Sequence, residues 1–369
     1  MKINFADPEI LKKDIKFVEN SLKSGWIGLG KYNTLLENSF KNLVKKKFAI
    51  SLSNGTSAAK IIFDSLSNGL NEENEIIVPY ICYVSPINMI LNSNKKFKIV
   101  PVKIDPNSFQ MDVNDTLRHI TNKTKAILVV HNYGNTANIK KIKNFCNKKY
   151  KKILIIEDFS EAIFSKYYFT KYAGSFGDIS FASFHATKTI ACGEGGILLT
   201  NNRKYFNFAL QASRHGMTLS KKEYSYEFPG FNFKLSNVLA ALGYSQFLRK
   251  DKIMSKRRDI TGIYKRYFIN KKNCVTPKFR NDETPTMWSF PILFNTKNEL
   301  DKVKKKLEKN GIITRESFKS ITKNNYIILD KMKNSNEMEE LSNRILMIPN
   351  HTKLNTKKIA YIKKIFEKK

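Results

Sequence analysis

One lysine in the sequence has surroundings that suit a chemical role. Lys188 lies in FASFHATKTIACGEGG, residues 181–196, where His185 is the only other basic residue. A lysine that attacks a carbonyl carbon must be partly neutral, and a poorly solvated pocket favours that form. The sequence therefore predicts that Lys188 is a nucleophilic amine able to form a Schiff base.

Other residues could bind a cofactor with a pyridine ring and a phosphate, which is the chemistry of pyridoxal 5′-phosphate. Asp158 ends an apolar run and could pair with the pyridinium nitrogen. Gly55 and Thr56, with Asn54 before them, open a predicted helix and offer N–H groups and a hydroxyl to a phosphate. Ser183 could add a hydroxyl there, and Tyr83 could lie flat on the ring. Each feature alone is common for structural reasons, but the set predicts a pyridoxal-phosphate site.

The elements that must position these residues follow an alternating pattern. Short β-branched runs predict strands, and amphipathic segments between them predict helices over 56–66, 86–94 and 138–150. The strands are expected at 48–54, 75–79, 96–104, 125–131 and 152–158. This alternation predicts an α/β fold with a mostly parallel sheet, whose ligands bind beyond the carboxyl ends of the strands. Residues 54–56, 80–83, 131–134 and 157–158 follow or end such strands.

A change in composition predicts two domains. After a predicted helix at 235–250 the lysine density rises, and the patches that follow indicate a smaller α+β unit. We therefore expect a large cofactor-binding domain over residues 1–250 and a small C-terminal domain over 251–369.

Composition restricts the class of protein. The chain has 369 residues and a formal charge of +33, but 55 of its 65 basic residues are lysine, and they are spread along most of the chain. Nucleic-acid readers favour arginine, so we expect a solvated basic surface and no nucleic-acid partner. The N-terminal segment does not resemble a signal peptide and no run has membrane-spanning length, which predicts a cytoplasmic protein with no membrane partner.

The sequence does not support a metal site, a nucleotide triphosphate site or a dinucleotide site. The four cysteines are far apart and predict reduced thiols, with no metal motif among them. GWIGLGKY, residues 25–32, nearly matches a phosphate-binding loop, but Tyr32 replaces the required Ser or Thr and no strand precedes it. The sequence also lacks the Gly-x-Gly-x-x-Gly and His-Glu-x-x-His motifs.

The order of these motifs along nearly the whole chain resembles the DegT/DnrJ/EryC1/StrS family of sugar aminotransferases. The segments that carry the resemblance are SGWIGLGKY, SNGTSAA, VPYICYVSPINMI, VVHNYG, IIEDFSEA, GSFGDISFASFHATKTIACGEGG, SRHG, PGFNFKLSNVLAALG, GIITR and MIPNHTKL. The family has the aspartate-aminotransferase fold, fold type I. The resemblance thus implies a large domain with a mostly parallel seven-stranded sheet and a smaller C-terminal α+β domain.

The resemblance also implies roles for individual residues. Lys188 would bind the cofactor and move the proton, Asp158 would hold the pyridinium nitrogen, and Tyr83 would stack on the ring. Ser183, Gly55 and Thr56 would bind the phosphate, together with Asn232 of the neighbouring subunit, which implies a homodimer with shared active sites. Glu161 would lie near the ring hydroxyl, after an unexpectedly bulky Phe159. Residues expected on the substrate side are Trp26, His185, His215 and Arg315.

The implied reaction takes an amino group from L-glutamate, through pyridoxamine 5′-phosphate, to a nucleotide-linked keto sugar. The KTIACGEGG run resembles the branch that acts at C4 of a 4-keto-6-deoxy sugar linked to GDP, UDP or dTDP. Amination at C3 and transamination of a small phosphorylated ketone remain open, and so does a non-catalytic binding protein on the same fold. A sugar 3-dehydratase of the family would have histidine in place of Lys188.

Overall fold

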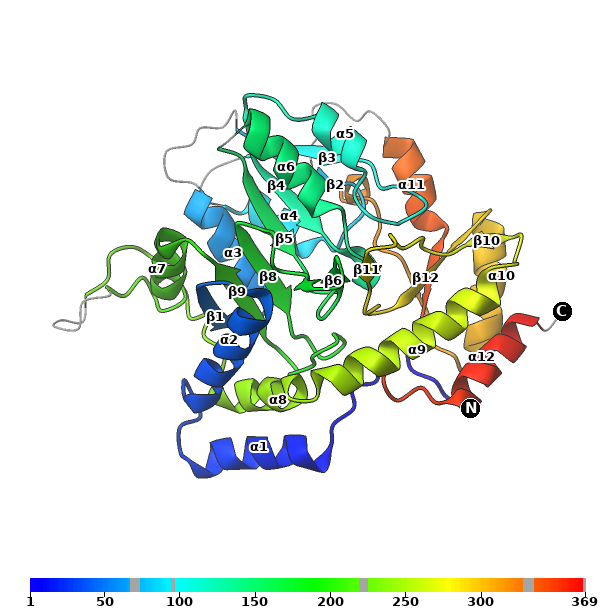
Figure 1. The fold of residues 1–369 in the computed structure, drawn as a ribbon, viewed down its shortest axis with the longest axis horizontal. Helices are drawn as coiled ribbons and strands as arrows, with labels where there is room; N and C mark the ends of the chain where they lie inside the picture. Colours follow the sequence, from blue (N-terminus) through cyan, green and yellow to red (C-terminus); the bar gives the residue numbers. More distant parts are fainter. Residues whose placement is uncertain (67–73, 94–96, 151, 219–224, 328–334, 368–369) are drawn as a thin grey trace.

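The computed structural model describes residues 1–66, 74–93, 97–150, 152–218, 225–327 and 335–367 (Figure 1). Its largest element is a seven-stranded sheet in which β9 runs antiparallel to both neighbours and the other neighbouring pairs are parallel. The strands, in spatial order, are β1 (Phe48–Leu52), β9 (Gly196–Thr200), β8 (Ile179–Ser183), β5 (Leu154–Asp158), β4 (Thr124–Val130), β2 (Glu75–Pro79) and β3 (Lys98–Val102). The prediction of a mostly parallel seven-stranded sheet is confirmed.

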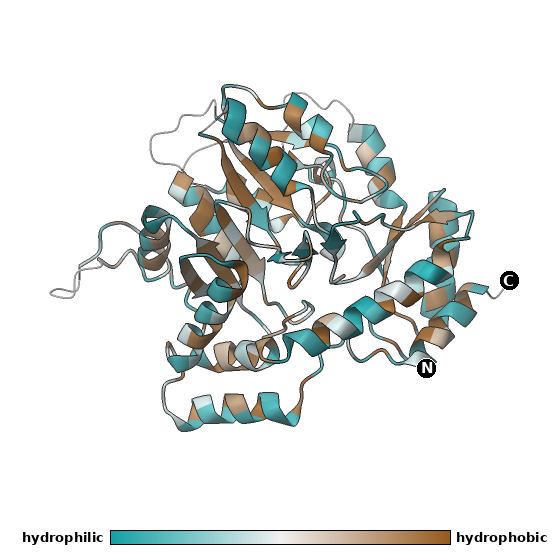
Figure 2. Ribbon diagram, in the orientation of Figure 1, coloured by the Kyte–Doolittle hydropathy of each residue, from teal (hydrophilic) through white to brown (hydrophobic). Residues whose placement is uncertain are grey.

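Helices cover both faces of this sheet because its strands are apolar on both sides. Along β2, Ile76 and Val78 face one hydrophobic cluster and Ile77 faces the other, as the two-residue repeat of a strand requires. One face packs against α3 (Gly55–Leu66), α4 (Ser85–Leu91) and α7 (Arg203–Ala212). The other packs against α2 (Lys31–Val44), α6 (Ile139–Lys149) and α8 (Asn237–Phe247). Figure 2 shows the apolar strands enclosed by helices whose outer surfaces are hydrophilic.

A second, antiparallel sheet lies toward the C-terminus. Its spatial order is β10 (Cys274–Val275), β12 (Phe290–Phe294), β14 (Ile345–Ile348) and β13 (Arg315–Glu316). Helices α9 (Lys250–Phe268), α10 (Lys297–Lys309) and α12 (Thr356–Glu367) bury side chains in the hydrophobic cluster of this sheet, and α11 (Ser335–Asn343) buries Met338 and Leu341 in the cluster that includes α3 and α4. The N-terminal segment joins this unit, because Ile3 pairs with Ile312 and is buried in the cluster of the second sheet. In Figure 1 both chain ends lie at this end of the molecule.

The two sheets are connected by the long helix α9. The helix predicted at 235–250 is α8, which ends at Phe247, and α9 starts at Lys250 and runs toward the second sheet (Figure 1). The expected division near residue 250 coincides with this start and stays a prediction. The remaining elements are the helices α1 (Lys12–Lys23) and α5 (Val113–Arg118), the short 3-10 helices η1 (Asn132–Gly134) and η2 (Ile321–Lys323), and a small sheet of β11 (Glu283–Thr284), β6 (Lys166–Tyr167) and β7 (Lys171–Tyr172).

No helix among the described residues combines the length and apolar character needed to span a bilayer. The described part of the chain also contains no group of three or more His, Cys, Asp or Glu side chains arranged to hold a metal ion. The four cysteines, Cys82, Cys146, Cys192 and Cys274, are free and buried.

Candidate active site

A cavity of about 360 Å³ lies beyond the carboxyl ends of β4 and β5 and is closed on one side by residues near the second sheet. Nine of the residues selected from the sequence line it: Gly55, Thr56, Tyr83, Asp158, Glu161, Ser183, His185, Lys188 and Arg315. A volume of several hundred Å³ is typical of a ligand pocket.

Lys188 is held by a tight loop between β8 and β9. Within this loop the N–H of Lys188 donates to the carbonyl of His185 at 2.8 Å, and Ala186 donates to Gly193 at 2.8 Å. Gly193 has a φ of 89°, a backbone conformation that glycine adopts without strain. Gln246 of α8 binds both the N–H and the carbonyl of Ala191. The glycine turn therefore returns the chain into β9 and leaves Lys188 at the cavity.

The Lys188 amine pairs with a buried carboxylate. Its Nζ lies 3.1 Å from Oε1 of Glu161, while Oε2 of Glu161 accepts the Tyr133 N–H at 2.7 Å. Burial raises the pKa of Glu161, and the charge of Lys188 and the Tyr133 N–H oppose that rise. The amine also lies 4.3 Å from the centroid of the Trp288 ring. The lysine is thus held by one charge and one aromatic face.

The end of β5 carries two adjacent carboxylates, and the strand geometry gives them different surroundings. Asp158 lines the cavity; burial raises its pKa, and hydrogen bonds from Ser160 oppose the rise. Glu157 is bound by the N–H groups of Gly174 and Gly177 and by His131 Nε2 at 3.0 Å. Burial alone would raise the pKa of Glu157, but these contacts lower it to about 2. Asp158 is therefore the carboxylate that a ligand can reach.

The start of α3 lies directly against β8. A Cβ on Gly55 would come 2.9 Å from Cβ of Ser183, so only glycine allows this approach. The first N–H groups of a helix have no partner within it, and here they begin at the cavity. The Thr56 hydroxyl lies 2.6 Å from that of Ser85, and the Ser183 hydroxyl accepts the His185 N–H at 3.2 Å. This corner offers N–H groups and hydroxyls suited to a phosphate.

Aromatic rings line the cavity on the side of the second sheet. Phe318 contacts Tyr83 edge-on at 5.9 Å and lies parallel to Tyr133 at 5.9 Å and to Trp288 at 6.4 Å. Of these rings, only Tyr83 has a cofactor-binding role predicted from the sequence. Trp288 and Phe318 stand in ordinary apolar patches of the sequence, so no local pattern marks them.

The structure also explains the bulky residue after Asp158. Phe159 is buried in the hydrophobic cluster on the face away from the cavity, next to Gly174, which has a φ of 95°.

Three residues selected from the sequence do not line this cavity within one chain. Trp26 is 72% exposed and lies in the turn between α1 and α2, where its carbonyl accepts a hydrogen bond from Asn237. His215 is exposed, and its N–H donates to the carbonyl of Phe231. Asn232 is also exposed and pairs with Arg214. Their roles stay predictions.

The donor set of the cavity fits pyridoxal phosphate. An amine, a carboxylate at a strand end and a helix start with hydroxyls are the three kinds of group that this cofactor needs. In addition, Oδ1 of Asn132, which lines the cavity, is buried and has no hydrogen-bond partner among the described residues. A polar ligand would satisfy it.

Comparison with known proteins supports the same assignment. Residues 8–367 match the model of the DegT/DnrJ/EryC1/StrS aminotransferase family. The chain is 33% identical to GDP-perosamine synthase of Escherichia coli O157:H7 over 96% of its own length and 95% of that protein. It is 27% identical to UDP-4-amino-4,6-dideoxy-N-acetyl-beta-L-altrosamine transaminase of Helicobacter pylori, over 97% of this chain and 95% of that protein.

A solved structure shows the same fold over the whole chain. Helicobacter pylori PseC, an aminotransferase involved in the biosynthesis of pseudoaminic acid, superposes with a TM-score of 0.90 at 25% identity, covering 99% of this chain and 98% of that one. The family match, these relatives and the cavity lead to one conclusion. The chain belongs to the DegT/DnrJ/EryC1/StrS aminotransferase family and is a pyridoxal-phosphate-dependent aminotransferase.

Proposed function

We propose that this enzyme transfers the amino group of L-glutamate to C4 of a nucleotide-linked 4-keto-6-deoxy sugar. The observation that carries the proposal is the Lys188 amine, held 3.1 Å from Glu161 in a cavity that also contains Asp158 and the start of α3. The relatives support the sugar substrate and its position, because one is a GDP-sugar synthase and another is named for a 4-amino-4,6-dideoxy sugar.

In this reaction some residues of the chain would bind the cofactor, and Lys188 would transfer the proton. When bound, pyridoxal phosphate supplies an electron sink for the substrate carbon. Asp158 would hold the ring nitrogen, and Gly55, Thr56 and Ser183 would hold the phosphate. The Lys188 amine would then carry a proton between neighbouring substrate atoms, since its flexible stem ends in the cavity.

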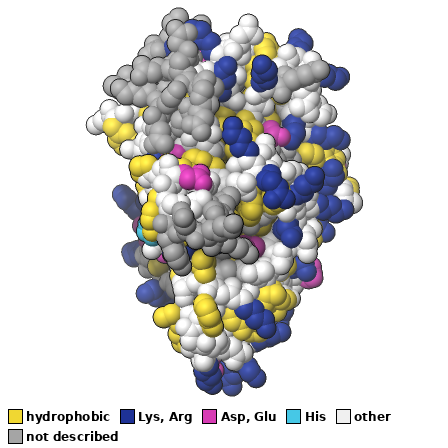
Figure 3. Space-filling view, turned by 90° about the vertical axis from the view of Figure 1, so that its left-hand side faces the viewer, with side chains coloured by type: hydrophobic (Ala, Val, Ile, Leu, Met, Phe, Trp, Pro, Cys, Tyr) yellow, Lys and Arg dark blue, Asp and Glu magenta, His cyan; other side chains and the backbone are white. Residues whose placement is uncertain are grey.

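The side of the cavity next to the second sheet suits an anionic, extended substrate. Arg315 lines it with its guanidinium 4.7 Å from the ring centroid of Phe5, and no carboxylate of the described residues forms an ion pair with it. Figure 3 shows Lys and Arg side chains spread over one face of the molecule, with few acidic ones. A basic surface raises the local concentration of anions such as nucleotide diphosphates.

The first experiment tests the cofactor step. Purified protein with pyridoxal phosphate should develop a visible absorbance band that borohydride removes with covalent labelling of Lys188, and L-glutamate should bleach it. Lys188→Ala should show neither the labelling nor the bleaching. Labelling of another residue would refute the assigned role of Lys188.

The second experiment tests the acceptor. The enzyme and L-glutamate are incubated with a 4-keto nucleotide sugar, a 3-keto nucleotide sugar or a small phosphorylated ketone, and products are identified by mass. Amination of only the 4-keto sugar is expected. Amination of only the 3-keto sugar would move the reaction to C3, and reaction with only the small ketone would refute the sugar substrate.

We also propose that two copies share their active sites through Asn232, which is exposed in one chain. Lys188→Ala and Asn232→Ala proteins should each be inactive alone. After unfolding and refolding together in equal amounts, hybrid dimers would contain one intact site, so about a quarter of wild-type activity should return. No recovery in a mixture shown to contain hybrid dimers would refute a shared site.

A further inference from the structure

Trp288 touches both the side chain and the backbone of the loop that carries Lys188. The indole Nε1–H donates to the carbonyl of Thr187 at 2.6 Å, and the ring centroid lies 4.3 Å from the Lys188 Nζ. The side chain is only 6% exposed. One ring therefore contacts the reactive amine and fixes the residue before it.

Trp288 is itself held by several distant segments. Its N–H donates to Tyr133 at 2.8 Å, and its carbonyl accepts from Arg257 of α9 at 3.0 Å. Its ring meets Phe5 edge-on at 5.5 Å and lies parallel to Phe318 at 6.4 Å. These contacts come from the N-terminal segment, the loop after β4, helix α9 and the segment after β13, so the ring has little freedom to move.

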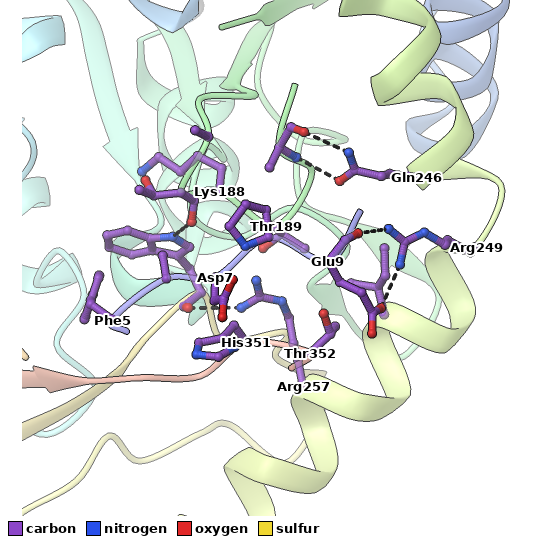
Figure 4. A pocket seen from close by; sticks show the side chains of 17 residues that line it. Phe5, Asp7, Glu9, Lys188, Thr189, Gln246, Arg249, Arg257, His351 and Thr352 are labelled. Atoms are coloured by element: carbon purple, nitrogen blue, oxygen red, sulfur yellow. Dashed lines mark hydrogen bonds and ion pairs between the residues drawn. The ribbon is translucent and has the colours of Figure 1, made fainter. Parts of the chain in front are cut away.

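A second, much smaller cavity lies on another side of Lys188. Its volume of about 20 Å³ is enough for roughly one water molecule. In Figure 4, Arg257 extends from α9 into this cavity beside His351, and Lys188 lies at its other side. Thr187, Lys188 and Trp288 line both this cavity and the large one.

The small cavity is polar, so it offers the Lys188 amine a second position besides the one next to Glu161. Thr189 Oγ1, Arg257 Nε and His351 Nδ1 are buried and have no hydrogen-bond partner among the described residues, and all three residues line it. Two of these atoms can accept a hydrogen bond from an ammonium or from water. Without the Trp288 ring, Lys188 and water would have room to meet there.

We propose that Trp288 is a positioning residue for Lys188. Its ring face keeps the amine on the side of Glu161 and Asp158, and its Nε1–H holds the loop at Thr187. This inference rests on the proposed role of Lys188 as the amine that bonds to the cofactor aldehyde. In that step the amine nitrogen forms a bond to the aldehyde carbon, and the carbonyl oxygen leaves as water.

Two variants separate the two contacts of the ring. Trp288→Phe keeps an aromatic face but loses the donor to Thr187, and Trp288→Leu loses both. The control is Phe290→Leu, which changes a buried ring of the same segment; Phe290 lies in β12 of the second sheet and packs on Tyr264 of α9. The rate constants of borohydride-trapped labelling and of bleaching by L-glutamate are measured, with the thermal stability of each variant.

We expect a loss of about 100-fold in both rate constants for Trp288→Leu, because misplacing a reactive group by about 1 Å has an effect of this size. The loss for Trp288→Phe should be about tenfold, since one hydrogen bond is removed. KM for L-glutamate should be unchanged in both, as a positioning role predicts. Wild-type rates in Trp288→Leu, or equal losses in Phe290→Leu, would overturn the proposal.

A measurement without cofactor keeps this test independent of the proposed function. In Trp26→Phe protein, Trp288 is the only tryptophan. Replacing Lys188 by Met in that protein should change the Trp288 emission, because the charge next to the ring is removed. An unchanged emission would show that the ring does not contact the amine in solution, whatever the reaction is.

Discussion

The Lys188 Nζ and Oε1 of Glu161 form an ion pair at 3.1 Å in which the side chains are 12% and 5% exposed. Because both side chains are largely buried, each charged group is stabilised by the opposite charge of the other. Burial already raises the pKa of Glu161, and the charge of Lys188 limits the rise. Lys188→Met should raise that pKa further, because the opposing charge is gone.

This pair predicts a pH-dependent loss of stability. In Lys188→Met, Glu161 has a higher pKa in the folded than in the unfolded state, so stability is highest below the unfolded pKa and falls as pH rises through the folded value. Urea unfolding of the cofactor-free protein should show a deficit against wild type that grows by about 3 kcal/mol between about pH 4 and about pH 8. The double variant Lys188→Met, Glu161→Gln should remove the growth. A pH-independent deficit would contradict the prediction.

Gly55→Ala should weaken cofactor binding about tenfold, since the new Cβ would lie 2.9 Å from Ser183 and push the start of α3 away. The affinity for pyridoxal phosphate is measured by titration. Gly262→Ala, in the middle of α9 with only the end of the Arg266 side chain within 4 Å, is the matched control. It should keep the affinity and gain about 1 kcal/mol of stability. Equal affinities for the two variants would contradict the close approach.

His351 should make the enzyme less stable in mild acid. Burial and the charge of Arg257 lower its pKa to about 4, and its Nε2–H donates to the Asn4 carbonyl at 3.1 Å. The unfolded chain binds this proton near the ordinary value while the folded chain does not, so stability should fall by up to about 3 kcal/mol as pH drops from about 6.5 to about 4. His351→Gln keeps a donor for Asn4 and removes the titration. Its stability should therefore fall less than that of wild type over this range, as urea unfolding can show.

Arg315→Gln should raise KM for the nucleotide-linked substrate about tenfold or more, because a charge-assisted hydrogen bond to an anion is lost. The effect on kcat should be smaller, since Arg315 lines the cavity together with Phe318 on the side of the second sheet. The control is Lys319→Gln, whose lysine pairs with Glu316 at 3.0 Å and does not line the cavity. Equal KM values for Arg315→Gln and wild type would exclude Arg315 from substrate binding.

Local patterns in the sequence were sufficient to predict the large sheet and the glycine turn after Lys188. A β-branched run such as EIIVP can bury both faces only in a covered sheet, and β2 has the predicted bounds of Glu75–Pro79. The glycine turn after Lys188 needs a backbone conformation that one residue type provides, and Gly193 adopts it. A strand and a tight turn depend on residues that are neighbours in the chain, so both can be predicted from the amino-acid sequence.

The tertiary structure decided what lies around that centre. Asp158 was selected from the sequence, but the fold alone brings its neighbour Glu157 to the turn at Gly174 while Asp158 lines the cavity. Trp288 lies 100 residues from Lys188 in an ordinary apolar patch, and the fold alone brings its ring to 4.3 Å from the amine. The sequence by itself therefore determined the strands, the turn and the reactive lysine, because local sterics and burial specify them. Which distant side chains contact that lysine depends on how two sheets and α9 pack together, and no local pattern encodes that arrangement.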